Sequence, residues 1–262
     1  MTIYKPKPED YVRIDVEGKK RKVLSTQACE NFNTSLLGVG DLTQASIATD
    51  AIAAVFDLEG FTNFCKQIEP HLSVPLFLSE FLSWLMEQIK EEMIKEMLEA
   101  GAILWSPLPF FIKFMGDGIL VLWDSSEMGD VARRNVIVSL YSICQRYTKV
   151  FLPKIQGKVV EPPSILRCGV ARGTVYSVGN GNDFVGSCIN MAARIQKLPG
   201  STFAFNRRGF DIEGSNVVKF FKEKVTVRRV SIRGIGENEL IAILKPEFDS
   251  MKATDKKIYR DP

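Results

Sequence analysis

The spacing of apolar residues along the 262-residue chain changes several times, and each spacing predicts a different element. A continuous apolar run at residues 51–56, followed at once by a glycine turn, predicts a short buried strand. Apolar residues at helical spacing across 76–98 predict a long amphipathic helix that ends at Gly101. Pro70 and Pro75 predict a break in the segment before it.

The second half of the chain continues with strands and helices of ordinary length. Apolar stretches at 110–115 and 119–123 flank Gly116-Asp117-Gly118, which is a strong signal for a β-hairpin. The remaining expected elements are a helix at 131–147, a second hairpin of 165–170 and 174–178, a helix at 186–198, a strand at 202–205 and a strand pair at 225–232 and 240–244. Strand, helix, two strands, helix, strand is the ferredoxin-like order, so we predict an α+β fold with a βαββαβ core and extra strands.

The pattern divides the chain into three regions. Residues 1–48 are polar and predict an extension with one short strand at 11–16, residues 49–246 hold the predicted core domain, and 247–262 predict a charged, frayed tail. The extension is locally basic through Lys5, Lys7, Arg13, Lys19, Lys20, Arg21 and Lys22. Because no aromatic residues interleave with these charges, we expect a solvated arm and no nucleic-acid partner.

Composition narrows the class of protein. Hydrophobic residues make up 45% of the chain and charged residues 25%, as in ordinary globular proteins, and the net charge of +3 says little about partners. The five cysteines form no CxxC pair, which favours core residues of a reducing compartment over disulfides or zinc ligands. With no signal peptide and no apolar run long enough to span a bilayer, we expect a cytoplasmic protein without a membrane partner.

Histidine chemistry has little support in this sequence. His71 is the only histidine, which excludes a His-rich zinc site and leaves a Ser/His/Asp mechanism without supporting spacing. If the protein is an enzyme, carboxylates, lysines and arginines must carry its chemistry.

Asp57 stands where the strand at 51–56 is expected to meet solvent. Gly60 then permits a tight turn, and Thr62 is expected to cap a helix that carries Phe64 and Ile68. In such an arrangement the carboxylate binds a divalent cation, and the N–H groups of the first helical turn face phosphate oxygens. An Asp in an ordinary strand-to-helix turn explains the same residues equally well.

A second carboxylate, Asp117, lies between two glycines at the tip of the first predicted hairpin. If this hairpin lies beside the strand that ends in Asp57, the two carboxylates converge and hold two divalent cations. Such a pair supports in-line displacement at phosphorus. The alternative is that Gly-Asp-Gly is simply a favourable turn sequence.

Three motifs in this order resemble those of class III nucleotidyl cyclases. Phe56-Asp-Leu-Glu-Gly-Phe-Thr62 resembles their first metal-binding motif, and Lys113-Phe-Met-Gly-Asp117 resembles the second. Asp183-Phe-Val-Gly-Ser-Cys-Ile-Asn-Met-Ala-Ala-Arg194 is similar to the third, and the resemblance covers residues 51–244. It implies a cyclase core that binds a nucleoside triphosphate and two divalent cations, Mn²⁺ or Mg²⁺.

The resemblance also implies a role for each matching residue. It assigns metal binding to Asp57, Leu58 and Asp117, base binding to Lys113 and Asp183, catalysis to Asn190 (ribose) and Arg194 (transferring phosphate), and phosphate binding to Glu59, Gly60, Phe61, Thr62 and Arg233, the last by a loose match. In the family each site lies between two domains. One copy of each motif therefore implies a head-to-tail homodimer with two equivalent sites and an inactive monomer.

Elementary geometry agrees with two of these roles. Asn190 and Arg194 are four residues apart, so both project from one face of the helix at 186–198. An amide can hold a ribose oxygen, and a guanidinium can follow charge on the α-phosphoryl oxygens. Attack of the 3′-hydroxyl on its own α-phosphate is intramolecular, so orientation matters as much as charge. Taken alone, the two residues would be ordinary surface helix residues.

Base choice stays open at this level. A Lys donor beside an Asp acceptor suits adenine or cytosine, and uracil offers an O4 acceptor beside a ring N–H, so ATP, CTP and UTP all remain. Arg172, Tyr176 and Phe184 are candidates to fill a purine-sized pocket, and each fits plain packing equally well.

A lone domain after a short polar extension is also similar to the pyrimidine cyclases of the Pycsar antiphage systems, as are the motifs above and Arg208-Gly-Phe-Asp211. This similarity implies conversion of UTP, with CTP second, to a cyclic monophosphate that activates a separate effector protein in antiviral defence. An adenylate cyclase making cyclic AMP is the alternative. A degenerate domain that binds a nucleotide and regulates a partner is a third, although such domains usually lose a metal Asp or the Asn/Arg pair, which this chain keeps.

Overall fold

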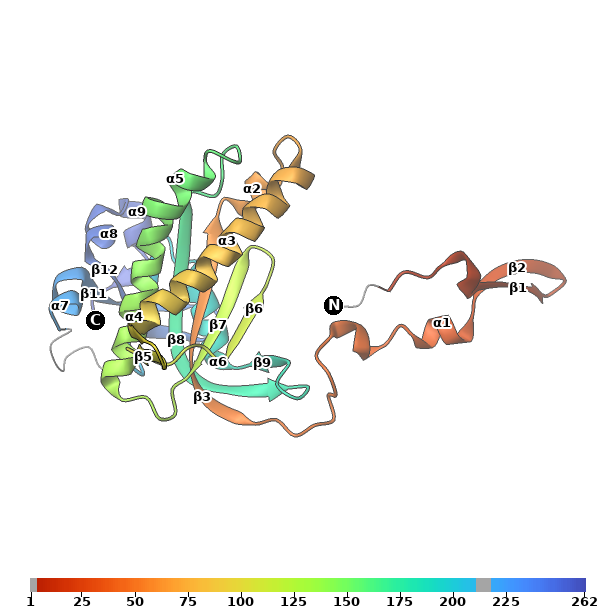
Figure 1. Ribbon diagram of the computed structural model, residues 1–262, viewed down its shortest axis with the longest axis horizontal. Coiled ribbons are helices and arrows are strands. Elements are labelled where there is room, and N and C mark those ends of the chain that lie inside the picture. The colour runs from red at the N-terminus through yellow and green to blue at the C-terminus, as the bar shows by residue number, and fades with distance from the viewer. Residues whose placement is uncertain (1–3, 211–217) are drawn as a thin grey trace. The chain divides into compact units, whose positions relative to one another are not determined.

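The computed structural model describes residues 4–210 and 218–262, and the chain divides into two compact units (Figure 1). The arm unit joins Met1–Ala48 to Tyr176–Val185, and the core unit consists of Thr49–Val175 and Gly186–Pro262. Within the described residues, no helix combines the length and apolarity that crossing a membrane requires.

Four strands form one half of the main sheet: β3 (Ala48–Glu59), β6 (Phe111–Phe114), β7 (Gly118–Asp124) and β8 (Ile165–Val178). Their order across the sheet is β8-β3-β7-β6, so the first and third strands of the motif lie between the fourth and the second. Helix α3 (Pro70–Met93) connects the first strand towards the second, and α4 (Asp130–Arg146) connects the third to the fourth. This is the predicted ferredoxin-like βαββαβ arrangement, and the α+β prediction is confirmed.

Further strands extend the sheet beyond β8, in the order β10-β12-β11-β13. The bounds of these strands and of the neighbouring helices are β10 (Phe203–Asn206), α7 (Val218–Lys224), β11 (Val225–Ile232), β12 (Gly236–Leu244), α8 (Lys245–Ser250), α9 (Ala253–Lys256) and β13 (Tyr259–Arg260). The tail is therefore built into the fold: β13 pairs with β11, and the Tyr259 hydroxyl donates to the Pro199 carbonyl at 2.8 Å. The prediction of a frayed tail is wrong, because Tyr259 buries its ring there.

The hydrophobic core lies on the side of the sheet that α3 and α4 cover (Figure 1). Alternate residues of β3 enter this core, among them Phe56 and Leu58, while Val55 and Asp57 face the opposite side. An aromatic cluster of Phe77, Phe81, Trp84, Tyr147 and Phe151 joins α3 to the end of α4. There α4 continues into a π-helical turn at Tyr147–Phe151 and then α5 (Leu152–Ile155).

Helix α6 (Ser187–Ile195) covers the other side of β8. A Cβ built on Gly169 would lie 2.2 Å from the Ala192 carbonyl oxygen, so strand and helix backbones are in direct contact there. Gly169 alternates with Cys168 and Val170, which both belong to the core on the α3 side. The sheet therefore carries α6 on the same side as Asp57.

Two predicted boundaries are wrong for tertiary reasons. The helix at 76–98 ends at Met93, and the chain continues as a hairpin of β4 (Ile94–Leu98) and β5 (Gly101–Leu104). Met97 is 65% exposed, so there is no core beyond Met93 for a longer helix to cover. Pro75 lies inside α3 without breaking it, and Pro70 occupies the first turn, where its missing N–H is tolerated.

The expected hairpin of 165–170 and 174–178 is one continuous strand, β8. A Cβ built on Gly173 would lie 3.3 Å from the Cβ of Cys188 in α6. Gly173 therefore permits close packing of the strand against the helix and does not mark a turn. The true hairpin partner of β8 is β9 (Asp183–Val185).

In the arm unit the predicted strand at 11–16 is confirmed as β1 (Tyr11–Val16), which pairs with β2 (Lys19–Leu24). A 3₁₀ turn at Pro8–Asp10 precedes this hairpin, and the helix α1 (Thr26–Glu30) and a second 3₁₀ turn at Thr34–Leu37 follow it. The end of the extension is bound to the β8–β9 hairpin: the Ile47 amide donates to the Ser177 hydroxyl at 2.8 Å, and the Ser46 hydroxyl donates to the Ser177 carbonyl at 2.8 Å. A Cβ on Gly179 would lie 1.5 Å from the Val39 carbonyl oxygen, so the two backbones touch.

Candidate active site

The pairing of two strands brings the backbone positions of the two predicted acidic residues together. In the antiparallel pairing of β3 with β7, Asp57 lies opposite Gly118, which directly follows Asp117. The Leu58 amide also donates to the Asp117 carbonyl at 3.2 Å, beyond the regular ladder. Residues that are 60 positions apart in the sequence are thus neighbours at one end of the sheet, as the hypothesis of a shared cation site requires. Asp57 is buried and Asp117 is exposed.

Lys113 lies on the same side of the sheet as Asp57. Its register partner on β7 is Leu120, and Leu120 in turn lies opposite Val55 on β3. Directly opposed residues project to one side, and Val55 and Asp57 are two residues apart on the same strand. The exposed Lys113 therefore projects from the side of the sheet that carries Asp57.

An arginine that sequence reasoning missed is bound directly to Asp57. Arg167 of β8 donates from Nε at 3.1 Å and from Nη2 at 2.5 Å, both to Oδ2 of the carboxylate. The sequence held one signal for it, because Arg167 interrupts an apolar strand between Leu166 and Cys168. A charge at such a position, on a strand in the middle of a sheet, needs a partner.

The turn after β3 differs in detail from the prediction. Gly60, with φ +86°, is the N-cap of the four-residue helix α2 (Phe61–Phe64), and no side chain caps it. Thr62 is not the cap: it is an exposed residue inside the helix. Only glycine adopts this backbone conformation without strain, so the turn depends on Gly60. Ile68, which was expected on the same helix as Phe64, lies beyond the end of α2 and is 92% exposed.

The remaining predicted phosphate contacts lie around this turn or far from it. Glu59 is exposed, and the Phe61 ring packs against Phe64 and Phe77. Arg233 is exposed in the turn between β11 and β12, on the distant part of the sheet.

Asn190 and Arg194 project away from the body of the protein. The buried residues of α6 are Cys188, Met191, Ala192 and Ile195, whereas Asn190 and Arg194 are both exposed. Within residues 4–210 and 218–262, no hydrogen bond or ion pair joins Asn190, Arg194 or Arg233 to either carboxylate. One chain thus presents two separate sets of candidate residues.

Cys188 is excluded as a nucleophile. Its thiol lies 3.5 Å from the Gly173 carbonyl, and burial raises its pKa to about 11, so the group stays protonated at neutral pH.

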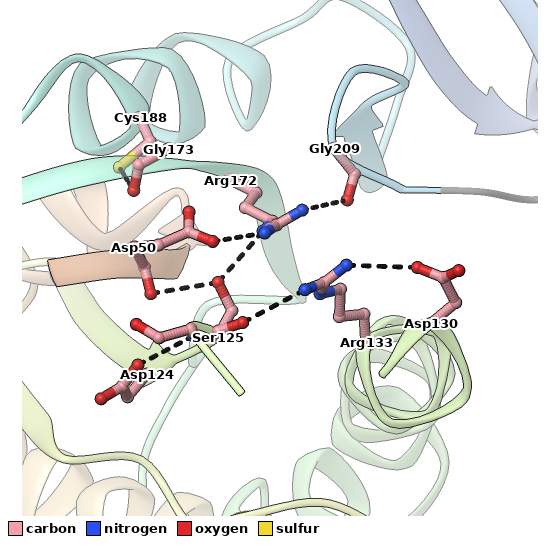
Figure 2. Close-up of polar contacts among 10 residues, drawn as sticks. Asp50, Asp124, Ser125, Asp130, Arg133, Arg172, Gly173, Cys188 and Gly209 are labelled. Carbon is pink, nitrogen blue, oxygen red and sulfur yellow. Dashed lines mark hydrogen bonds and ion pairs between the residues drawn. The ribbon is translucent and has the colours of Figure 1, made fainter. Parts of the chain in front are cut away.

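The residues predicted to recognise the base fall into different parts of the chain. Asp183 belongs to the arm unit, where its carboxylate accepts the Phe184 amide at 2.9 Å. In the core unit, Arg172 is held by other groups: it forms an ion pair with Asp50, donates from Nε to the Ser125 hydroxyl at 3.1 Å and from Nη1 to the Gly209 carbonyl at 3.3 Å (Figure 2).

These bonds make Arg172 a link between strand ends and the loop at Gly209, which argues against its role as a pocket-filling residue. Asp211 of the Arg208–Asp211 motif lies outside the described residues.

The oxygen donors at this end of the sheet fit magnesium or manganese. Both Arg167 bonds go to Oδ2 of Asp57, so Oδ1 has no hydrogen-bond partner among the described residues. No group of three or more His, Cys, Asp or Glu side chains suitable for a metal occurs in the described part of the chain. Two carboxylates and the Leu58 carbonyl would hold such ions, with water and phosphate oxygens completing the shell, which is a common mode for Mg²⁺.

Comparison with known proteins identifies the fold. No family model and no curated protein matches the chain. Among solved structures, the guanylyl cyclase Cya2 has a TM-score of 0.53 at 16% identity over 77% of this chain and 94% of that one. The catalytic core of a rhodopsin-guanylyl cyclase with converted specificity, in complex with ATPαS, has a TM-score of 0.51 at 15% identity over 76% and 98%. The guanylate cyclase domain of RhGC from Catenaria anguillulae, in complex with GTP, has a TM-score of 0.50 at 14% identity over 76% and 98%.

The chain has the fold of a class III nucleotidyl cyclase catalytic domain. Within this cyclase fold, Asp57 and Asp117 occupy the end of the central strand and the tip of the adjacent hairpin. Identities of 14–16% show the shared fold and leave the reaction and the substrate to be argued from the residues themselves.

Proposed function

We propose that the protein is a nucleotidyl cyclase that converts UTP, with CTP as the second candidate, to the 3′,5′-cyclic monophosphate and pyrophosphate. The observation that supports the proposal is the pairing of β3 with β7 within a cyclase fold, because it brings the backbone at Asp57 next to the backbone at Asp117. A shared fold alone would not support an activity, because folds host many functions. Two acidic residues, one at the end of β3 and one in the adjoining β6–β7 turn, with the matching motifs around them, do support one.

In the proposed reaction the 3′-oxygen of the ribose forms a bond to the α-phosphorus, and the bond from that phosphorus to the pyrophosphate oxygen breaks. The 3′-hydroxyl loses its proton, and pyrophosphate leaves. Asp57, Asp117 and the Leu58 carbonyl would hold two divalent cations, whose chemistry when bound would be to activate the attacking oxygen and to neutralise the phosphates. Asn190 would fix the ribose so that the 3′-oxygen is aligned, and Arg194 would bind the oxygens on which charge develops.

The exposed positions of Asn190 and Arg194 support a site built from two chains. Among the described residues neither forms a hydrogen bond or ion pair with Asp57 or Asp117, and both are exposed on α6. In a head-to-tail homodimer, one subunit would supply Asn190 and Arg194 from its α6, together with Lys113 and Asp183, to the metal-binding pair Asp57 and Asp117 of the other. Two equivalent sites would result.

Base recognition in this proposal rests on Lys113 and Asp183. Lys113 would donate to O4 of uracil, and Asp183 would accept the ring N–H. Resemblance of the motifs to the Pycsar enzymes favours the pyrimidine and a role in antiphage signalling through a separate effector. An adenylate cyclase is the second candidate, because the same donor and acceptor also match adenine.

The deciding experiment is incubation of the purified protein with each of the four nucleoside triphosphates and Mn²⁺, with the products identified by mass spectrometry. We expect cyclic UMP to form fastest, cyclic CMP next and cyclic AMP slowest. A clear preference for ATP would replace the proposed pyrimidine cyclase activity by an adenylate cyclase activity. Absence of any cyclic product would contradict the proposed enzymatic activity and favour a degenerate domain that only binds a nucleotide.

A complementation experiment tests the two-chain site. Asp117→Ala and Arg194→Ala should each abolish turnover. Mixing the two variants should restore about a quarter of the wild-type rate, because half of the dimers become heterodimers and each of these holds one intact site. Arg133→Ala is a matched control on α4, since Arg133 contacts Asp130 and the Ser125 carbonyl and should not affect complementation (Figure 2). No recovery on mixing would contradict the arrangement in trans.

A further inference from the structure

Arg167 has no chemical role in the reaction outlined above, although it binds a residue that is central to it. Its guanidinium donates twice to Oδ2 of Asp57, at 3.1 and 2.5 Å. The Asp57 side chain is 9% exposed and that of Arg167 is 23% exposed, so protein surrounds most of the pair. Oδ1 of Asp57, by contrast, has no hydrogen-bond partner among the described residues. One carboxylate oxygen is held, and the other is left for a further ligand.

The pair stabilises the protein when no cation is bound. A buried carboxylate without a positive partner is strongly unfavourable. Asp117 lies in the turn just before β7, with its backbone next to that of Leu58, so without Arg167 the Asp57 carboxylate would have a second acidic residue nearby and no guanidinium bound to it. Arg167 supplies that offsetting charge from the strand on the other side of β3.

The same positive charge opposes a divalent cation. An ion bound to Oδ1 would lie about 5 Å from a guanidinium that is bound to Oδ2 of the same carboxylate, where repulsion between like charges is substantial in a partly buried site. The phosphates of a nucleoside triphosphate would remove this penalty by adding negative charge. Binding of the cation is then favourable when the nucleotide binds with it and unfavourable when the cation binds alone.

We infer that Arg167 competes with a divalent cation for Asp57 and thereby makes cation binding depend on the triphosphate of the substrate. The inference rests on the proposed function for the nature of the ion and the substrate. Arg167 is a positioning residue in this account: it sets the charge and orientation of Asp57 and contacts no reacting atom. Because of this competition, the site binds free metal ions only weakly when no nucleotide is present.

The test is a titration of the 262-residue protein with Mn²⁺ in the absence of nucleotide. The electron paramagnetic resonance signal of the free ion measures how much Mn²⁺ remains unbound. Arg167→Gln removes the charge and keeps a side chain that can donate to the carboxylate. We expect this variant to bind Mn²⁺ about tenfold more tightly than the wild type. Its melting temperature should be lower than that of the wild type without metal and should rise more when Mn²⁺ is added.

A matched control comes from the same strand. Arg172 of β8 also forms an ion pair with an aspartate of β3, Asp50, and its side chain is 21% exposed. Arg172→Gln should leave Mn²⁺ affinity unchanged. In the double variant Asp57→Asn with Arg167→Gln, the gain in affinity should disappear, because the proposed ligand has been removed.

The outcomes separate the inference from the proposed function, since no measurement uses turnover. Affinity of Arg167→Gln equal to or weaker than the wild type would overturn the competition and leave Arg167 a structural partner of Asp57. If the variant binds Mn²⁺ more tightly but the wild type makes no cyclic nucleotide, the inference stands and the proposed function fails.

Should the Gln variant not fold, Arg167→Lys carries the test. It keeps the charge, so its Mn²⁺ affinity should stay within about threefold of the wild type, and a tenfold gain would show that charge is not the cause.

Discussion

Gly169 offers a sharp test of how the fold places α6. A methyl group added there would lie 2.2 Å from the Ala192 carbonyl oxygen and 2.5 Å from the Gln196 amide nitrogen. These two atoms form a hydrogen bond of 3.1 Å at the end of α6, so the methyl group would press on both partners at once. Neither is the end of a flexible side chain. The conflict can be relieved only by moving the helix away from β8.

The magnitude follows from the contact distance. To bring a 2.2 Å contact to an ordinary van der Waals separation, α6 must retreat by about 1 Å. Overpacking of this kind costs about 1–3 kcal/mol, which corresponds to a fall of about 2–10 °C in the melting temperature of a protein of this size. Because α6 carries Asn190 and Arg194, a displacement of about 1 Å should also reduce kcat by about 100-fold under the proposed function.

Gly173 provides the control for this substitution. It lies on the same strand and faces the same helix, but a methyl group there would meet Cys188 Cβ at 3.3 Å, a contact that small shifts can relieve. We therefore expect Gly169→Ala to lower the melting temperature and kcat strongly, and Gly173→Ala to change both only slightly. Circular dichroism melting and the nucleotide assay measure the two effects. Equal melting temperatures for both variants, or an unaffected Gly169→Ala, would refute the direct backbone contact.

Three further predictions address other parts of the chain. Asp117→Ala should abolish turnover while the melting temperature changes by less than about 1 °C, because Asp117 is exposed; a large loss of stability would give the residue a structural role instead. Gly179→Ala should expose the chain near Val39 to proteases, since φ is +54° and the methyl group would lie 1.5 Å from the Val39 carbonyl oxygen; an unchanged cleavage pattern on gels would contradict this contact. Burial raises the pKa of Glu247 above 4.5, so the folded protein favours the protonated carboxyl group. The stability that this carboxyl group contributes is therefore lost as pH rises through the raised pKa. Thermal melts should therefore show the wild type losing stability relative to Glu247→Gln as pH rises above 4.5, and parallel curves would exclude the effect.

Local signals predicted the central part of the fold correctly. The apolar run at 51–56 and the Gly116-Asp117-Gly118 turn each depend on a few neighbouring residues, and both elements formed as expected in β3, β6 and β7. Their pairing followed from the ferredoxin-like order, which leaves few ways to arrange four strands. Asp57 and Asp117 were therefore predictable as neighbours, because strand ends and hairpin tips meet at the same edge of a sheet.

The errors arose where distant contacts override local preference. Gly173 resembles a turn residue in sequence, but it serves the approach of α6 to β8. The helical pattern beyond Met93 continues in the sequence although no core remains to bury it. Arg167 could be recognised as a charge on an apolar strand, but its partner depends on the neighbouring strand, which sequence spacing does not identify.

The bonds between Ser177 and the segment at Ser46–Ile47 bear on how the protein should be produced for study. A recombinant fragment that starts at Thr49, where the core unit begins, would lack the groups that pair with the amide, hydroxyl and carbonyl of Ser177. Three polar groups of a buried residue would then have to find water or other partners. Ser177 lies opposite Phe184 in the hairpin that also contains Asp183, the residue proposed to bind the base. Under the proposed function, a nucleotide preference measured on such a fragment would therefore describe the fragment and not the whole chain.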